Sequence, residues 1–253
     1  MKNIKNLFIA FAWLVVQPIW AADLTVSAAA SLTQAFQEIA IQFEAKHPET
    51  KLRFNFAASG ALLQQIINGA PVDVFASADT DTMDKAIAKS VVNAADSKIF
   101  TTNRLVLITP LQSSAGMKHL SDLKNQDIKR IAMGVPASVP AGHYTMVSLE
   151  KAGLWRDVKD KIIYTQNVKQ ALDYVARGEV DAGFVYASDA QFMADKVKTA
   201  FQVNTSTPIQ YPIAKTVSSA QADAANKFIA FVQSPSGQAV LKKFGFGNEA
   251  AVR

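Results

Sequence analysis

The stretch that decides the fold is residues 24–56, which read LTVSAAASLTQAFQEIAIQFEAKHPETKLRFNF. The apolar run from Leu24 to Ala28 predicts a buried strand, and the alternating Leu52, Phe54 and Phe56 predict another. Between them lies a predicted helix at 32–45, whose apolar residues recur at helical spacing. That apolar face carries Leu32, Ala35, Phe36, Ile39, Ala40 and Phe43. A strand, a helix and a strand in this order predict two parallel strands joined by a crossover helix.

The same alternation continues along the rest of the chain. Further strands are predicted at 73–78, 104–110, 130–134, 161–164, 182–186 and 211–215. Further helices are predicted at 60–68, 80–89, 141–152, 168–177, 221–232 and 237–244. This order predicts the α/β class, with helices flanking mixed, mostly parallel sheets.

We predict two lobes joined by two chain crossings, near Thr102 and near Tyr211. Lobe 1 comprises residues 23–102 and 213–253, and lobe 2 comprises residues 103–212. The last two helices are amphipathic and need an apolar surface to cover, which the first lobe would provide.

Residues 1–22 have the pattern of a secretory signal peptide. Two lysines precede an apolar run from Leu7 to Val16, and Ala21 and Ala22 form a small-residue exit. A membrane anchor is the alternative, but it needs about 20 apolar residues, and a glutamine and a proline end this run. We therefore expect cleavage after Ala21 or Ala22 and a periplasmic product.

Composition limits the classes of function. The chain contains no cysteine, so an exported product must be stabilised by its core, for which about 230 residues are ample. The formal charge is a mild +5, and lysines and acids are interspersed without a basic run or interleaved aromatics. This pattern argues against nucleic acid as a partner.

Two serines follow predicted strands at equivalent positions. In open α/β sheets, ligands bind beyond the carboxyl ends of strands, where helix N-termini present free N–H groups. Ser31 follows the first strand and is predicted as the N-cap of the next helix, while Ser59 follows the second strand. An ordinary helix cap is the alternative role for Ser31. Gly60 removes a side chain where a ligand or a backbone must come close.

The second lobe offers three more neutral donors. Ala141 follows Pro140 at a helix start and keeps a free N–H. Val168 does the same after Asn167, a predicted cap, and Tyr186 places a phenol at a strand end. Well-started helices and a buried tyrosine are the alternative roles. Because none of these positions carries lysine or arginine, we expect an anion held by amides, hydroxyls and helix dipoles.

Catalysis finds little support in the sequence. His47, His119 and His143 stand at unrelated points, without metal-ligand spacing or a serine–histidine–acid pattern. Asp79 and Asp189 each follow a strand and are interpreted as helix caps. A hydrolytic enzyme is therefore the less favoured alternative to a binding protein.

Five ordered motifs run through the chain: AAASLT (28–33), FAAS (56–59), GAPVDVFASAD (69–79), VPAGHY (139–144) and GFVYASDA (183–190). They resemble the periplasmic molybdate-binding component of an ABC-type importer, in the type II periplasmic binding protein family. The resemblance implies a two-lobed fold that binds molybdate, and tungstate as well, and delivers it to a membrane permease. It implies binding by Ser31 and Ser59 through hydroxyl and amide, by the amides of Ala141 and Val168, and by the Tyr186 hydroxyl. It also implies a monomer without a cofactor, with molybdenum present only as the oxyanion.

Other tetrahedral anions stay open as alternatives. Phosphate often needs an acceptor for its remaining proton, and no acid stands at the five positions. Sulfate is chemically close to molybdate but slightly smaller, so cavity size decides between them. An amino-acid site would want an arginine and an acid, and a sugar site would want stacking aromatics, neither of which the loops carry.

Overall fold

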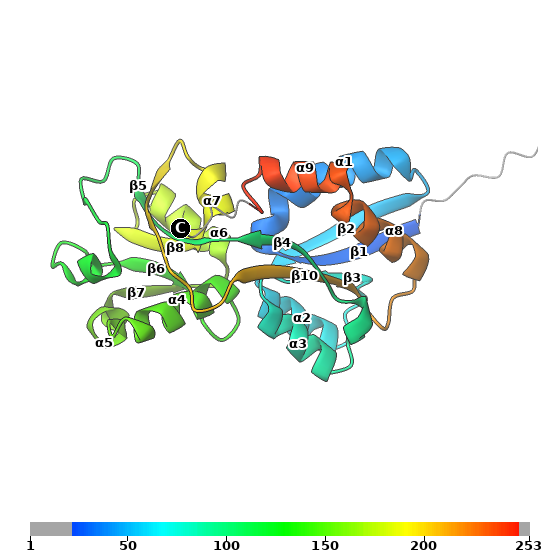
Figure 1. The fold of residues 1–253 in the computed structure, drawn as a ribbon, viewed down its shortest axis with the longest axis horizontal. Coiled ribbons are helices and arrows are strands. Elements are labelled where there is room, and N and C mark those ends of the chain that lie inside the picture. The colour runs from blue at the N-terminus through cyan, green and yellow to red at the C-terminus, as the bar shows by residue number, and fades with distance from the viewer. Residues whose placement is uncertain (1–21, 248–253) are drawn as a thin grey trace, which may run out of the picture.

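The computed structural model describes residues 22–247, so the predicted signal peptide lies outside the described residues except for Ala22. Two five-stranded sheets lie side by side, each flanked by helices (Figure 1). The predicted α/β class with two lobes is confirmed.

The first sheet has the strand order β2-β1-β3-β10-β4. Its strands are β1 (Ala22–Ala29), β2 (Thr50–Ala57), β3 (Val74–Ala76), β4 (Lys98–Asn103) and β10 (Ile209–Lys215). The helices of this half are α1 (Thr33–Lys46), α2 (Ser59–Ile67), α3 (Thr80–Ala88), α8 (Ala222–Gln233) and α9 (Pro235–Lys243). Strands β1, β2 and β3 are parallel, whereas β10 runs antiparallel to both of its neighbours.

The second sheet repeats this pattern in the order β7-β6-β8-β5-β9. Its strands are β5 (Leu105–Pro110), β6 (Ile131–Gly134), β7 (Ile162–Thr165), β8 (Ala182–Tyr186) and β9 (Val197–Gln202). Its helices are α4 (Pro140–Lys151), α5 (Trp155–Val158), α6 (Val168–Ala176) and α7 (Ala187–Phe192). Here β5 is the antiparallel strand. Short 3-10 turns are η1 (Ala30–Leu32), η2 (Ala94–Asp96), η3 (Leu120–Lys124) and η4 (Lys159–Lys161).

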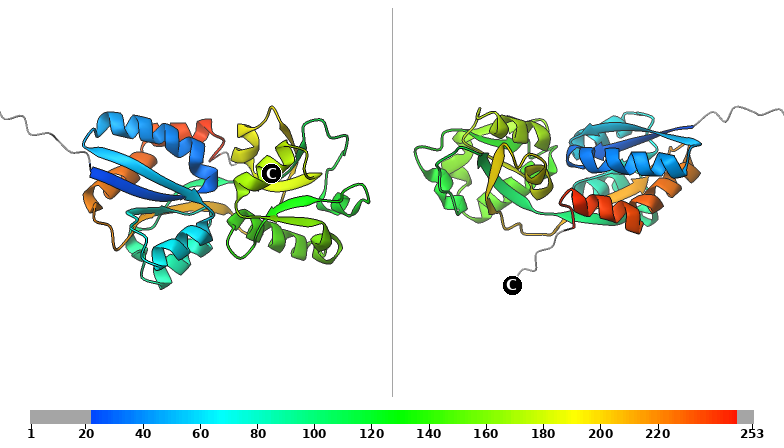
Figure 2. Two further views of the ribbon diagram at one scale, coloured as in Figure 1. Left: turned by 180° about the vertical axis from the view of Figure 1, so that it is seen from behind. Right: turned by 90° about the horizontal axis from the view of Figure 1, so that it is seen from above.

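The chain crosses between the two sheets from β4 to β5 and again from β9 to β10, as the right-hand view of Figure 2 shows. Ile209 pairs with Asn103 in the first sheet. Strand β10 therefore pairs with the first sheet from residue 209 onward, whereas the predicted lobe 1 resumes only at residue 213.

Helices α8 and α9 lie beside α1 on the first sheet (Figure 1). Aromatic rings carry this packing: the Phe36 and Phe228 centroids are 5.8 Å apart, and those of Phe43 and Phe231 are 5.6 Å apart. Each buried phenylalanine contributes roughly 1.5–3 kcal/mol to folding, so the C-terminal helices fix the first half of the molecule.

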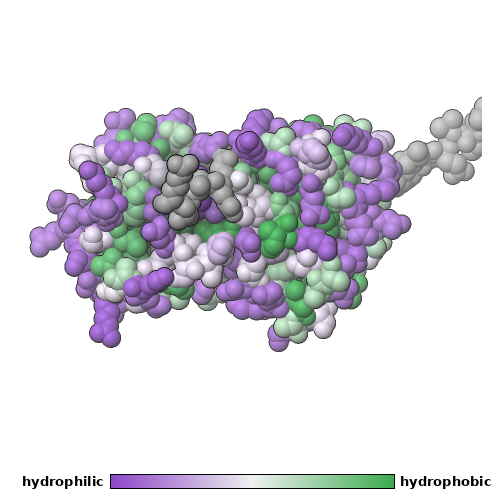
Figure 3. Space-filling model, viewed as in Figure 1, coloured by the Kyte–Doolittle hydropathy of each residue, from purple (hydrophilic) through white to green (hydrophobic). Residues whose placement is uncertain are grey.

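The surface is largely hydrophilic, with apolar residues in small separate areas on the face shown in Figure 3. Within residues 22–247, no helix combines the length and apolar character needed to cross a membrane.

Candidate functional site

One small cavity between the two sheets is lined by all five residues predicted to bind the anion: Ser31, Ser59, Ala141, Val168 and Tyr186. The remaining lining residues are Ala29, Ala30, Ala57, Ala58, Ala78, Val139, Pro140 and Asn167. The cavity holds about 210 Å³ of empty space, its open mouth included. Among residues 22–247, the side chains that line it are all uncharged.

Ser31 does not cap a helix, and this prediction is wrong. The chain after β1 makes the tight turn η1, so Ser31 lies inside that turn and Leu32 becomes the N-cap of α1, without a side-chain capping bond. The hydroxyl of Ser31 is buried and lies 3.0 Å from the Tyr211 Oη instead. Ser31 is thus connected to strand β10 and remains in the cavity wall.

Ser59 is the first residue of α2, directly after the N-cap Ala58. Its Oγ accepts a hydrogen bond of 3.0 Å from the Ala78 N–H. Because a serine hydroxyl both donates and accepts, its own proton stays available for a ligand in the cavity.

Gly60 allows the two halves of the molecule to approach each other. Its N–H donates to the Ser138 carbonyl at 3.0 Å, and a Cβ at Gly60 would lie 2.8 Å from that same oxygen. The close approach predicted for this glycine is therefore to the backbone of the other half.

Two helix N-termini of the second half point N–H groups at the cavity. Pro140 is the first residue of α4, so Ala141 follows it in the first turn. Val168 is the first residue of α6, which Asn167 caps by accepting the Gln170 N–H at 3.0 Å, as predicted. The first N–H groups of a helix have no partner within the helix, so Ala141 and Val168 can donate to an anion, and the helix dipoles favour it.

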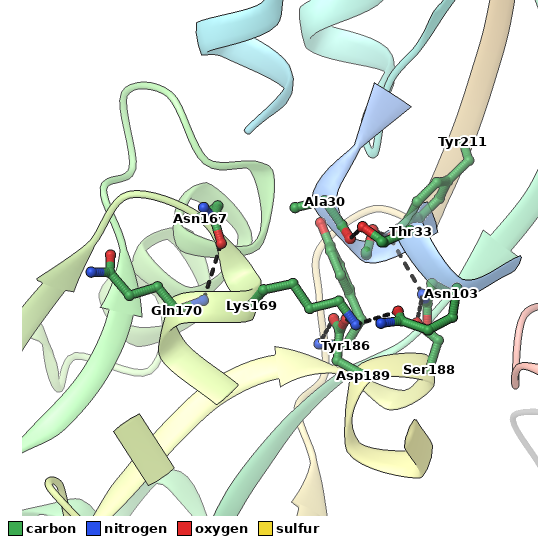
Figure 4. Close-up of polar contacts among 12 residues, drawn as sticks. Ala30, Thr33, Asn103, Asn167, Lys169, Gln170, Tyr186, Ser188, Asp189 and Tyr211 are labelled. Carbon is green, nitrogen blue, oxygen red and sulfur yellow. Dashed lines mark hydrogen bonds and ion pairs between the residues drawn. The ribbon is translucent and has the colours of Figure 1, made fainter. Parts of the chain in front are cut away.

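Tyr186 carries an unpaired polar atom at the cavity. Its hydroxyl is buried and has no hydrogen-bond partner among residues 22–247. Burial raises the pKa of this phenol well above its ordinary value, so it stays protonated at neutral pH and keeps a proton to donate to an acceptor. Figure 4 shows its ring directed toward Ala30, across the cavity. The structure therefore presents a buried donor that an oxyanion would satisfy.

Lys169, which follows the cavity residue Val168, has its charge paired outside the cavity lining. Lys169 forms an ion pair with Asp189 at 3.2 Å (Figure 4). It also donates to Gln34 Oε1 at 2.7 Å. Burial raises the pKa of Asp189, and the charge of Lys169 opposes that rise. Asp189 also accepts the Tyr186 N–H at 3.3 Å, so it stabilises the start of α7 from within its first turn. The prediction that Asp189 is a helix cap is wrong, because α7 begins at Ala187 and Tyr186 is its N-cap.

The other polar residues considered from the sequence have structural roles or lie elsewhere. Asp79 caps α3 by accepting the Thr82 N–H at 3.3 Å, as predicted, and burial raises its pKa. His143 does not line the cavity and lies 3.7 Å from an Asp81 carboxylate oxygen. Within the described part of the chain, no group of three or more His, Asp or Glu side chains could hold a metal ion.

Two residues beside the cavity are not predicted from the sequence. Tyr211 is fully buried in β10, and Asn103 lies at the end of β4, with its Nδ2 3.3 Å from the Tyr211 Oη. A tyrosine in an apolar strand and an asparagine at a strand end carry no local signal of function. The register of β4 against β10 brings them together.

Two sheets joined by two crossings, with a cavity of neutral donors between them, are the architecture of a two-lobed solute-binding protein. The sequence pattern of the bacterial extracellular solute-binding proteins matches residues 24–247, and the chain belongs to this family.

Individual relatives agree with this assignment. The molybdate-binding protein ModA of Haemophilus influenzae is 34% identical over 233 residues, which are 89% of this chain and 90% of the relative. The periplasmic molybdate-binding protein of Azotobacter vinelandii superposes with a TM-score of 0.80 at 24% identity, over 88% of this chain and 98% of that one. The sulfate-binding protein SubI of Mycobacterium tuberculosis reaches 0.78 at 15% identity, over 91% and 88%. The resemblance predicted from the sequence is confirmed, while the fold alone does not separate one anion from another.

Proposed function

We propose that this chain is the periplasmic substrate-binding protein of an ABC importer, which captures molybdate, and tungstate as well, and delivers it to a membrane permease. One observation carries the proposal: neutral donors from both halves converge on one cavity, where the Tyr186 hydroxyl is buried without a partner in the described part of the chain. The 34% identity to a molybdate-binding relative supports molybdate as the anion.

The donors can compensate for dehydration of a doubly charged anion. Hydrogen bonds to a charged group contribute about 1.5–3 kcal/mol each, and each helix N-terminus adds roughly 0.3–1 kcal/mol. Half a dozen such contacts would offset much of the large cost of removing a dianion from water. Fixed neutral donors select by geometry and by cavity size, so sulfate is the anion against which selectivity is tested most severely.

Binding would favour the closed arrangement of the lobes. Two contacts already join the halves beside the cavity, from the Gly60 N–H to the Ser138 carbonyl and from Lys169 to Gln34. An anion that touches Ser31 and Ser59 on one side and Ala141 and Val168 on the other would stabilise the same arrangement, and the closed form would then dock on the permease.

Several finer statements belong to the same proposal. The leader is removed after Ala21 or Ala22, and the mature protein is a periplasmic monomer. It needs no cofactor, carries molybdenum only as the oxyanion, does not bind nucleic acid and does not turn over its ligand.

The test is calorimetric titration of the mature protein with molybdate, tungstate, sulfate and phosphate. We expect one anion per chain, with molybdate and tungstate bound far more tightly than sulfate. Ser31→Ala and Ser59→Ala should each weaken molybdate binding, whereas Ser218→Ala, at an exposed serine outside the cavity, should leave it unchanged. Equal affinity for sulfate would reduce the protein to a general oxyanion binder, and unchanged affinity in both cavity variants would rule out the site.

Calorimetry is preferred to tryptophan fluorescence on structural grounds. Trp155 is the sole tryptophan of residues 22–247 and lies in α5, outside the lining of the cavity. Its emission would report the anion only indirectly.

A further inference from the structure

A chain of hydrogen bonds connects a crossing between the lobes to the cavity. The Asn103 Nδ2 lies 2.8 Å from the Ser188 Oγ and 3.3 Å from the Tyr211 Oη. The Tyr211 Oη in turn lies 3.0 Å from the Ser31 Oγ. These residues come from β4, α7, β10 and η1, and both hydroxyls of the Tyr211–Ser31 pair are buried.

The backbone fixes the orientation of the Asn103 amide. The Arg104 N–H donates to the Asn103 Oδ1 at 2.9 Å, so the carbonyl end faces the backbone. The amide nitrogen must then face the two hydroxyls, and a side-chain amide nitrogen only donates. Tyr211 is therefore a hydrogen-bond acceptor from Asn103.

The proton of Tyr211 has one acceptor left. Burial raises the pKa of Tyr211 well above its ordinary value, so the phenol stays protonated. Among the described residues, its other hydrogen-bond partner is the Ser31 Oγ. If Ser31 donated to Tyr211 instead, the phenol oxygen would accept two bonds and its own proton would be buried without a partner, which is costly. The phenol therefore donates to Ser31.

Because these hydrogen bonds run from Asn103 to Tyr211 and from Tyr211 to Ser31, the hydroxyl proton of Ser31 remains free. We propose that Asn103 and Tyr211 are positioning residues that make Ser31 a hydrogen-bond donor to the bound oxyanion. This inference rests on the proposed function of the cavity. Ser59 has the same arrangement, since its Oγ accepts from the Ala78 N–H and its proton stays free.

The consequence is a cavity that donates from every side. Both serines have an acceptor site occupied by the protein, and the Ala141 and Val168 amides can only donate. The Tyr186 hydroxyl has no partner among the residues that the structure describes. Such a site suits an anion without protons and disfavours one, such as hydrogen phosphate, that needs an acceptor.

A double-mutant cycle tests the route through Ser31. We would measure molybdate affinity by calorimetry for the wild type, Tyr211→Phe, Ser31→Ala and the double variant. Tyr211→Phe keeps the ring and should weaken binding on the order of 10-fold, but should cause no further loss in the Ser31→Ala background. Equal losses in both backgrounds, or no loss in the single variant, would overturn the proposal.

Asn103 supplies an independent test of the direction. In Asn103→Asp the carboxylate would accept the Tyr211 proton, so the phenol would accept from Ser31 and turn its proton away from the anion. Asn103→Asp should therefore weaken molybdate binding more than Asn103→Ala does, and a loss equal to or smaller than that of Asn103→Ala would overturn the proposed direction. Tyr174→Phe, which removes a phenol outside the cavity lining, is the matched control and should bind as the wild type does.

The outcomes separate the two proposals. Failure of the wild type to bind molybdate would refute the proposed function itself. If the wild type binds molybdate tightly but the affinity losses of Tyr211→Phe and Ser31→Ala add in the double variant, only the positioning role is refuted. Calorimetric melting of each variant without anion, with unfolding transitions like that of the wild type, shows that losses of affinity do not come from unfolding.

Discussion

Tyr186→Phe should change stability and affinity in opposite directions. The substitution removes only the hydroxyl oxygen and keeps the ring, whose centroid lies 5.8 Å from that of Tyr211 at an interplanar angle of 66°. In the structure this oxygen is buried and unpaired among the described residues. Its removal therefore deletes no protein hydrogen bond.

The magnitudes follow from that geometry. A buried, unsatisfied polar group costs about 1–3 kcal/mol, and about 1 kcal/mol corresponds to roughly 2–4 °C in Tm for a protein of this size. We expect the variant without anion to melt a few degrees above the wild type. A lost hydrogen bond to a charged anion costs about 1.5–3 kcal/mol, so molybdate affinity should fall between roughly 10-fold and 150-fold.

Differential scanning calorimetry of the protein without anion and isothermal titration with molybdate measure the two effects separately. The stabilisation by saturating molybdate should shrink in the variant, because ligand stabilisation follows affinity. An unchanged affinity would refute the assignment of Tyr186 as a donor. A lower melting temperature without anion would refute its description as unpaired.

Three further perturbations test other parts of the account. Gly60→Ala places a Cβ 2.8 Å from the Ser138 carbonyl oxygen, so it should hinder closure of the lobes. Molybdate binding should weaken about 10-fold, which corresponds to a free-energy cost in the usual range for overpacking. Full molybdate affinity of the variant in titration would show that closure does not need this close approach. Because burial raises the pKa of Tyr186, the donor persists in alkaline solution, and affinity should be flat from about pH 7 to about pH 9; a decline over that range would contradict the protonated phenol. Burial also raises the pKa of Asp79 in the folded protein. Above the pKa of about 4 that Asp79 has in the unfolded chain, the unfolded chain releases the proton more readily than the folded protein does. Ionisation of Asp79 therefore lowers the free energy of unfolding at neutral pH. Asp79→Asn keeps an acceptor for the Thr82 N–H and should melt at a higher temperature than the wild type at about pH 7. This difference in melting temperature should disappear below about pH 4. A difference that does not depend on pH would contradict a cost from the buried carboxylate.

Much of the fold follows from local sequence because its signals are local. The apolar face of α1 and the alternation in β2 identify those elements, and Asp79 and Asn167 begin helices as predicted. Strand β4 is missed because its sequence, KIFTTN, lacks a clear apolar alternation and its pairing depends on the distant strand β10. The antiparallel direction of β10 and β5 is also set by the crossings rather than by either strand.

For the cavity too, local sequence identifies some residues and not others. Strand ends followed by helix starts give Ser59, Ala141 and Val168 from sequence alone. Ser31 is predicted as a helix N-cap, but the turn η1 places the start of α1 after it, so it lines the cavity without capping a helix. The contact between Asn103 and Tyr211 joins residues 108 positions apart, so no local pattern reveals it.

The most direct measurement is a crystal structure of the mature protein with molybdate, with the anion located by the anomalous scattering of molybdenum. The account predicts a single site in the cavity, with oxygens within hydrogen-bond distance of the Ser31, Ser59 and Tyr186 hydroxyls and the Ala141 and Val168 amides. Molybdenum at any other place, or an anion held mainly by lysine or arginine, would contradict it.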